Sequence, residues 1–257
     1  MCWPMMQLRS LLFVAYLYGT MALMGSVFVI GLVLPRRFIM WGIKTYAGAL
    51  RWGMRVIAGM ETEIRGLEHL PDGPFLYVGK HQCMFDIFVP FVVTPDPAIV
   101  MKRELLWYPF LGWYALKSDM IPIDRAGTTK TLRRMVSAAK DRAAIGRQIV
   151  IFPEGTRKTP GDAPEYHAAG VVALYKALGV PVVPVATNAG LCWPAHGLMR
   201  RPGRIVYEIL PPIEPGLDRK EMMKRLESEM ETAVDALLQE GLAVQGRTKP
   251  VQDLQSI

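Results

Sequence analysis

A run of 25 uncharged residues near the N-terminus, from Ser10 to Leu34, constrains the fold more than any other feature. The run is rich in Leu, Val, Met and aromatic residues. As a helix it would be about 37 Å long, which is enough to cross the hydrocarbon core of a bilayer. It is too long for the apolar region of a signal peptide, and no small-residue cleavage motif precedes Pro35. We therefore predict an N-terminal membrane helix.

The charges on either side of this run predict its orientation. Arg9 lies on the N-terminal side, and the cations that follow the run are Arg36, Arg37, Lys44, Arg51 and Arg55. Cationic residues are enriched at the cytoplasmic end of membrane helices. We therefore expect a protein of the cell inner membrane whose remaining chain faces the cytoplasm.

A second segment, residues 38–60, combines apolar residues with cations. Arg37, Lys44, Arg51 and Arg55 share one helical face by their spacing. The opposite face carries Ile39, Met40, Trp41, Ile43, Ala47, Leu50, Met54 and Ile57. We expect a helix on the membrane surface, with its cations at lipid phosphates and its apolar face in the acyl chains. Two alternatives remain open: a helix that covers the domain core, and a hairpin with the first helix that enters one leaflet without crossing it.

Composition limits the partners of the chain. Its formal net charge of +7 fits an anionic partner, which could be nucleic acid, a phosphorylated substrate or an anionic lipid surface. We expect membrane lipids and no nucleic acid, because the cations lie beside apolar segments and no recognition module is visible. The 3 cysteines and 4 histidines lack the spacing of a disulfide framework or a metal site. We therefore expect no metal.

Beyond Glu61 the sequence alternates β-like runs with helical patterns. This alternation predicts an α/β domain over residues 61–243, between membrane-anchoring helices (1–60) and a polar tail (244–257). One helix should run from Thr128 or Thr129 to about Ile145, and a capping box of Asp218 and Glu221 should open another. The expected strands are residues 75–78, 98–101, 120–123, 148–152, 181–186 and 204–209.

Two blocks at the ends of expected strands contain reactive residues, where open α/β sheets place their ligands. In the first, residues 79–86, His81 and Asp86 can meet only if His81 lies in the turn before the following helix. Asp86 would then fix the imidazole tautomer, and His81 would act as a general base. The alternative is a structural histidine at a helix start. Backbone N–H groups near that helix start could stabilise an oxyanion.

The second block is Phe152-Pro-Glu-Gly-Thr-Arg-Lys158, which follows a strand. Gly155 would allow close backbone approach to a phosphate, and Arg157 could hydrogen-bond it through two N–H groups. Glu154 could orient Arg157 or the hydroxyl of an acceptor. By itself the block is equally consistent with a turn that carries a surface cation.

The order of the blocks resembles that of the 1-acyl-sn-glycerol-3-phosphate acyltransferase (lysophosphatidic acid acyltransferase, PlsC-like) family. That family has N-H-x4-D, G-x-I-x-I-D-R, F-P-E-G-T-R and V-P-V-x-P-V blocks, matched here by residues 80–86, 119–125, 152–157 and 180–185. The resemblance spans about residues 75–212. It implies a mixed, mostly parallel sheet flanked by helices, as in the glycerol-3-phosphate acyltransferase-like fold, together with N-terminal membrane helices.

The resemblance also implies an activity and a site. A fatty acyl group would pass from acyl-CoA or acyl-carrier protein, as co-substrate, to the sn-2 hydroxyl of 1-acyl-sn-glycerol 3-phosphate, forming phosphatidic acid without a cofactor. His81 and Asp86 would be the catalytic pair. The residues that would hold or adjoin the phosphorylated acceptor are Glu154, Gly155, Thr156, Arg157, Arg125, Lys102 and Arg103.

Departures from the family pattern raise further hypotheses. Lys80 stands where Asn is common, and Cys83 and Lys158 stand where Ser is common. Cys83 could form an acyl-enzyme, although a small residue beside His81 explains it without covalent chemistry. His167 could add a donor to the phosphate site or be a surface residue.

Three rival functions stay open. The acceptor could be another lysolipid, such as a lyso-ornithine lipid, or glycerol 3-phosphate. The His81–Asp86 pair could instead activate water in a hydrolase, which would release the acyl group without a lipid acceptor. A non-enzymatic lipid-binding protein would use the basic segment and would tolerate loss of His81.

Overall fold

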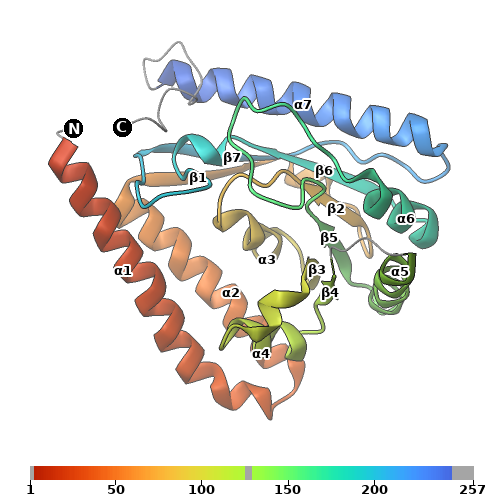
Figure 1. Ribbon diagram of the computed structural model, residues 1–257, viewed down its shortest axis with the longest axis horizontal. Coiled ribbons are helices and arrows are strands. Elements are labelled where there is room, and N and C mark those ends of the chain that lie inside the picture. The colour runs from red at the N-terminus through yellow and green to blue at the C-terminus, as the bar shows by residue number, and fades with distance from the viewer. Residues whose placement is uncertain (1–2, 125–128, 245–257) are drawn as a thin grey trace.

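The computed structural model describes residues 3–124 and 129–244. Its centre is a sheet of the strands β1 (Met60–Arg65), β2 (Leu76–Gly79), β3 (Pro97–Lys102), β4 (Ile121–Ile123), β5 (Gln148–Ile151), β6 (Val182–Thr187) and β7 (Gly203–Ile209). The seven strands lie in the order β1-β7-β6-β2-β5-β3-β4 (Figure 1). Every neighbouring pair is parallel except β6 with β7. The predicted mixed, mostly parallel sheet is confirmed.

Helices cover both faces of the sheet (Figure 1). The α-helices are α1 (Trp3–Val27), α2 (Arg36–Gly53), α3 (Val89–Val93), α4 (Leu111–Lys117), α5 (Thr129–Ala144), α6 (Ala168–Leu178) and α7 (Arg219–Val244). Short helices of other types are η1 (Phe28–Leu32), η2 (Met54–Ala58), η3 (Leu67–His69), η4 (Phe85–Ile87), η5 (Arg103–Trp107) and η6 (Ala189–Leu191).

The alternation of strand side chains divides the core into two layers. Leu76 and Val78 of β2 pack in one layer with residues of α5, α6 and α7. Tyr77, between them, faces the other layer, where Met40 of α2 and Phe91 of α3 contribute. Parallel strands buried on both faces read as continuous apolar runs, which is why the sequence predicts most of them.

The six predicted strands and two predicted helices are present, with ends that differ by one or two residues. Asp218 Oδ1 accepts hydrogen bonds from the backbone N–H groups of Lys220 and Glu221, so it caps α7 as predicted. Edge strand β1 was not predicted. Its sequence, Met-Glu-Thr-Glu-Ile-Arg, has charged residues at alternate positions, as in a half-exposed strand, but the helical segment expected over residues 38–60 ended at its first residue.

The N-terminal helices α1 and α2 lie side by side against the α/β domain (Figure 1). Among the described residues, one helix is long and apolar enough to cross a membrane, Trp3–Leu32. Contacts bind it to the rest of the chain along its length. Arg9 donates to the carbonyl of Ile57 at 2.6 Å, and the Tyr114 hydroxyl of α4 donates to the carbonyl of Gly25.

The cations of α2 have protein partners. Lys44 donates to the backbone carbonyls of Thr94 and Pro95, and Arg51 donates to Thr62. The residues of the predicted lipid face that are instead buried in protein are Ile39, Met40, Ala47, Leu50 and Met54. The expected lipid-facing position was therefore wrong for these residues, and the structure shows the alternative of a helix that covers the core. Trp41, on the same predicted face, is 61% exposed.

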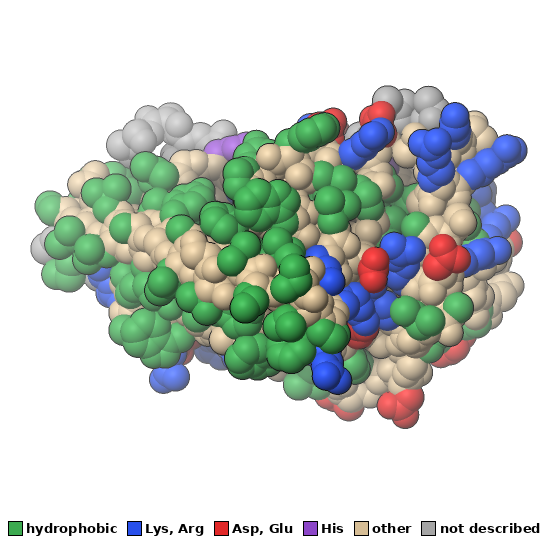
Figure 2. Space-filling view, turned by 90° about the horizontal axis from the view of Figure 1, so that it is seen from below, with side chains coloured by type: hydrophobic (Ala, Val, Ile, Leu, Met, Phe, Trp, Pro, Cys, Tyr) green, Lys and Arg blue, Asp and Glu red, His purple; other side chains and the backbone are tan. Residues whose placement is uncertain are grey.

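Apolar side chains that remain exposed are concentrated on other surfaces. Figure 2 shows hydrophobic side chains gathered over one part of the lower face, with charged side chains gathered over the other. The large exposed apolar residues of α1, η5 and α4 include Leu8, Leu11, Leu12, Leu23, Trp107, Trp113 and Leu116. A continuous apolar surface of this kind is typical of membrane contact.

Candidate active site

The turn between β2 and η4 brings His81 and Asp86 together. His81 Nδ1 lies 3.1 Å from Asp86 Oδ2, and the His81 ring lies against the ring of Phe152. An ionised carboxylate can only accept, so Nδ1 carries the proton and Nε2 is the basic nitrogen. The predicted juxtaposition is therefore confirmed, with His81 in the turn before the helix.

The same carboxylate organises the backbone of the turn. Asp86 Oδ2 accepts hydrogen bonds from the N–H groups of Gln82 at 2.6 Å and Cys83 at 2.7 Å. These two donors at the helix start are therefore engaged by Asp86 and do not supply the expected oxyanion stabilisation. Gln82 in turn accepts a hydrogen bond from the backbone of Gly190, which fixes the turn against η6.

Cys83 supports Asp86 from a fully buried position. Its thiol donates to Asp86 Oδ1 at 3.2 Å. Burial, and then the Asp86 charge, raises the pKa of this thiol well above its usual value. The reactive form of a cysteine is the thiolate, so this environment disfavours the acyl-enzyme hypothesis.

Replacement of Cys83 by serine is therefore expected to leave kcat close to that of the parent protein. The serine hydroxyl can donate to Asp86 from the same position. Initial rates of the two proteins in an assay of the acyl transfer that the sequence resemblance implies, normalised to folded protein, provide the measurement. A loss of several orders of magnitude, as follows removal of a catalytic nucleophile, would support the acyl-enzyme instead.

The loop after β5 holds His81 by both of its backbone groups. The His81 N–H donates to Glu154 Oε2 at 2.8 Å, and the Lys158 N–H donates to the His81 carbonyl at 2.7 Å. Glu154 is 2% exposed and lies behind the turn. Its side chain therefore contacts the turn that contains His81, and does not orient the Arg157 guanidinium by any hydrogen bond among the described residues.

A buried ion network surrounds Glu154. Lys80 Nζ lies 2.6 Å from Glu154 and 2.9 Å from Glu231 of α7, and Tyr166 donates to Glu231. Burial raises the pKa of Glu154, against the opposing effects of Lys80 and of the His81 N–H. Sequence reasoning missed Glu231. The available signal was Lys80 itself, because a lysine directly after a buried strand requires a partner.

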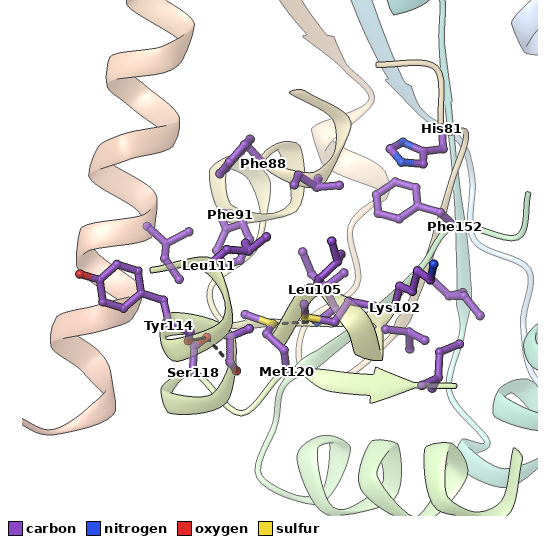
Figure 3. A pocket seen from close by; sticks show the side chains of 18 of the residues that line it. His81, Phe88, Phe91, Lys102, Leu105, Leu111, Tyr114, Ser118, Met120 and Phe152 are labelled. Atoms are coloured by element: carbon purple, nitrogen blue, oxygen red, sulfur yellow. Dashed lines mark hydrogen bonds between the residues drawn. The ribbon is translucent and has the colours of Figure 1, made fainter. Parts of the chain in front are cut away.

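A cavity of about 520 Å³ begins beside His81. Figure 3 shows His81 and Phe152 at one end and Tyr114, Ser118 and Met120 at the other. Side chains of α1, α2, α3, α4 and α5 contribute to its predominantly apolar lining. The cavity therefore fits a long apolar group whose reactive end lies at His81.

Some of the residues predicted to hold the phosphorylated acceptor line this cavity, and others do not. Lys102 lines the cavity together with Gly155 and His167, whereas Arg103 and Thr156 are exposed. Gly155 has a φ of 65°, which favours glycine, and an added Cβ would lie 3.1 Å from His167. Arg125 lies outside the described residues.

Arg157 is half-buried, and among the described residues it has no carboxylate partner. A second guanidinium, that of Arg200, is 6% exposed and lies over the Trp193 ring. Burial, and to a smaller extent the nearby charge of Arg157, lowers the pKa of Arg200 to about 10. The guanidinium groups of Arg157 and Arg200 therefore repel each other, and an anion between or beside them would relieve this repulsion. Arg200 was missed because it lies beyond every motif block.

The site can perform proton transfer beside an apolar cavity with cations at its edge. Within the described residues, no group of three or more His, Cys, Asp or Glu side chains is arranged to hold a metal ion. The chemistry available from the residues themselves is removal of a hydroxyl proton by His81 Nε2, with Asp86 stabilising the resulting imidazolium.

The chain is similar to several known proteins. Residues 61–188 match the family model described as Acyltransferase. A Pseudomonas aeruginosa protein named 1-acyl-sn-glycerol-3-phosphate acyltransferase is 33% identical over 198 residues, covering 77% of this chain and 75% of that protein. A Saccharomyces cerevisiae protein of the same name is 26% identical, covering 79% and 69%. The crystal structure of the 1-acyl-sn-glycerophosphate acyltransferase PlsC from Thermotoga maritima superposes with a TM-score of 0.73 at 22% identity, covering 90% of this chain and 98% of that one.

Proposed function

This chain belongs to the 1-acyl-sn-glycerol-3-phosphate acyltransferase family, and from its site we propose that it acylates the sn-2 hydroxyl of 1-acyl-sn-glycerol 3-phosphate. The product is phosphatidic acid, an intermediate of phospholipid biosynthesis. The observation that carries the proposal is the His81–Asp86 pair, which opens onto an apolar cavity of about 520 Å³.

The reaction follows from the geometry of the turn. His81 Nε2 takes the proton of the acceptor hydroxyl while the hydroxyl oxygen attacks the thioester carbonyl of acyl-CoA or acyl-carrier protein. The tetrahedral intermediate then collapses, the C–S bond breaks, and the imidazolium returns its proton to the departing thiolate. Asp86 holds the imidazole in one tautomer throughout. No cofactor enters this sequence, because deprotonation of the hydroxyl is the chemical assistance that a thioester requires.

The site residues take different roles in this proposal. His81 is the catalytic base, and Asp86 orients it. Arg157, supported by Arg200 and Lys102, binds the acceptor phosphate, while Gly155 and Thr156 form the loop that approaches it. Glu154 holds the catalytic turn in place from behind, because its carboxylate is buried against the backbone of His81.

Replacement of Arg157 by alanine is expected to raise the KM for lysophosphatidate about 10- to 100-fold with a smaller change in kcat. This range corresponds to loss of one hydrogen-bonded ionic contact, worth about 1.5–3 kcal/mol. Steady-state kinetics with lysophosphatidate and with monoacylglycerol provide the measurement, because the second acceptor lacks the phosphate. Equal changes for both acceptors would contradict a role in phosphate recognition.

The direct test of the proposed function supplies purified protein in lipid nanodiscs with labelled acyl-CoA or acyl-carrier protein. The acceptors are lysophosphatidate, glycerol 3-phosphate, a lyso-ornithine lipid and none. We expect labelled phosphatidate from the first acceptor. Preferential acylation of another acceptor would reassign the substrate, and acceptor-independent release of fatty acid would indicate a hydrolase.

The proposed location is the cytoplasmic face of the inner membrane, with the exposed apolar face of α1 inserted in one leaflet. Hydrogen bonds of Ser10 with Arg200 and of Gly25 with Tyr114 hold both ends of α1 against the domain, which supports a helix that lies along the domain. The exposed apolar surface of α1, η5 and α4 supports immersion of the same face. This orientation places the cavity beside the lipid from which the acceptor comes.

A further inference from the structure

The Asp86 carboxylate is held by a residue that lies outside every motif block. Tyr207 of β7 donates its hydroxyl to Asp86 Oδ1 at 2.8 Å. Tyr207 is 2% exposed and Asp86 is 1% exposed, so water does not compete for this hydrogen bond. The two carboxylate oxygens are therefore used differently: Oδ2 faces His81 and the turn amides, and Oδ1 faces β7.

The Tyr207 hydroxyl is the principal donor to Oδ1. The other donor is the Cys83 thiol, at 3.2 Å, and a thiol is a weak hydrogen-bond donor. Burial, followed by the Asp86 charge, raises the pKa of Tyr207 well above its usual value, which keeps the hydroxyl protonated. Within the described residues, no lysine or arginine forms an ion pair with Asp86. Neutral donors alone therefore stabilise this buried charge.

We propose that Tyr207 is a positioning residue for acyl transfer, whose hydroxyl fixes the Asp86 carboxylate so that Oδ2 points at His81 Nδ1. The position of β7 supports this role. The strand pairs with β6 on one side and β1 on the other, and the Tyr207 ring also packs against Phe85 in the catalytic turn. The proposal deepens the function proposed above and rests on it.

The role has a pH signature. The Tyr207 hydroxyl partly neutralises the negative charge of Asp86 through its hydrogen bond. Without this hydroxyl, the carboxylate stabilises the imidazolium form of His81 more strongly. His81 then takes up a proton at a higher pH, and the protonated form cannot act as a base. The acid limb of the kcat profile should therefore move to higher pH.

Other titratable groups around the carboxylate do not produce this signature. Burial raises the pKa values of the Tyr77 hydroxyl and the Cys83 thiol, so both stay protonated in the assay range. Among the described residues, other charged or titratable groups near the turn are Glu154 with Lys80 behind it and Arg200 from the segment before β7. Lys102, Asp124 and His167 line the same cavity as His81. The Tyr207→Phe change removes no contact of these groups.

The test compares Tyr207→Phe with Tyr175→Phe. Phenylalanine keeps the ring that packs on Phe85. Tyr175 provides a matched control, since its buried hydroxyl bonds the backbone of Glu214 and Leu217 away from the catalytic turn. General-base assistance contributes about 10²- to 10⁴-fold. We expect Tyr207→Phe to lose part of this general-base assistance, so that its kcat at pH 7 falls about tenfold. The kcat should recover partly at higher pH, and the KM for the acceptor should not change.

The control should match the parent protein in kcat per folded molecule and in pH profile. An unchanged kcat and pH profile for Tyr207→Phe, or an effect that appears only in KM, would overturn the proposal.

Should Tyr207→Phe fail to fold, 3-fluorotyrosine incorporated at position 207 keeps the shape of the side chain and has a more acidic phenol. The acid limb should then move to lower pH, and an unmoved limb would overturn the proposal. Phosphatidate formation by the parent protein in the same assay separates failure of this inference from failure of the proposed function.

Discussion

Replacement of His81 by alanine is expected to lower kcat about 10²- to 10⁴-fold, the range that general-base assistance contributes. No other described imidazole contacts Asp86, so no other described histidine is oriented by this carboxylate. The residual rate would come from binding the thioester and the hydroxyl in one cavity. Single-turnover transfer from labelled acyl-CoA to lysophosphatidate provides the measurement.

His196→Ala is the matched control for this change, because His196 is exposed and, in the described part of the chain, forms no hydrogen bond with the turn that contains His81. Its kcat should equal that of the parent. Thermal unfolding followed by circular dichroism should give similar Tm values for all three proteins. A turnover near that of the parent in a folded His81→Ala protein would show that another group is the base, or that no base is needed.

The sequence predicts the sheet well because its strands are buried on both faces. Residues 76–78 and 149–151 form continuous apolar runs, and the intervening helices repeat apolar residues at helical spacing. The strand–turn–helix order also places His81 and Asp86 together without any coordinates. Edge strand β1 was missed although its alternating charged residues are typical of a half-exposed strand, because it begins at Met60, where the expected helical segment 38–60 ended.

Other features depend on tertiary contacts that no local pattern contains. Tyr207 lies 121 residues from Asp86, and in sequence it is one aromatic residue in an apolar strand. The cations of α2 follow the spacing of a membrane-surface helix, yet Lys44 and Arg51 bond to the catalytic domain. The helical period shows which residues share a face, but it cannot show whether that face meets lipid or protein.

The largest stability effect should come from the ion network behind His81. In a Lys80→Met variant, Glu154 and Glu231 lose the cation between them. Breaking a buried ion pair by removal of one partner costs about 3–5 kcal/mol. We expect a decrease of that size in the free energy of unfolding, measured in urea. The comparison variant Arg225→Met breaks an exposed pair with Glu229 and should lose less than about 0.5 kcal/mol.

The pH dependence of this loss gives the prediction a second measurement. Burial already raises the pKa of Glu154, and loss of Lys80 raises it further. A group whose pKa is higher in the folded state favours folding at low pH, and this contribution is lost as pH rises through the folded-state pKa. The Lys80→Met variant should therefore be less destabilised at about pH 5 than at about pH 8.

Adding Glu154→Gln to the Lys80→Met variant should restore part of the stability at about pH 8. The amide oxygen can still accept a hydrogen bond from the His81 N–H, and no charge is then buried. A loss independent of pH would mean that Lys80 contributes through packing and not through its charge.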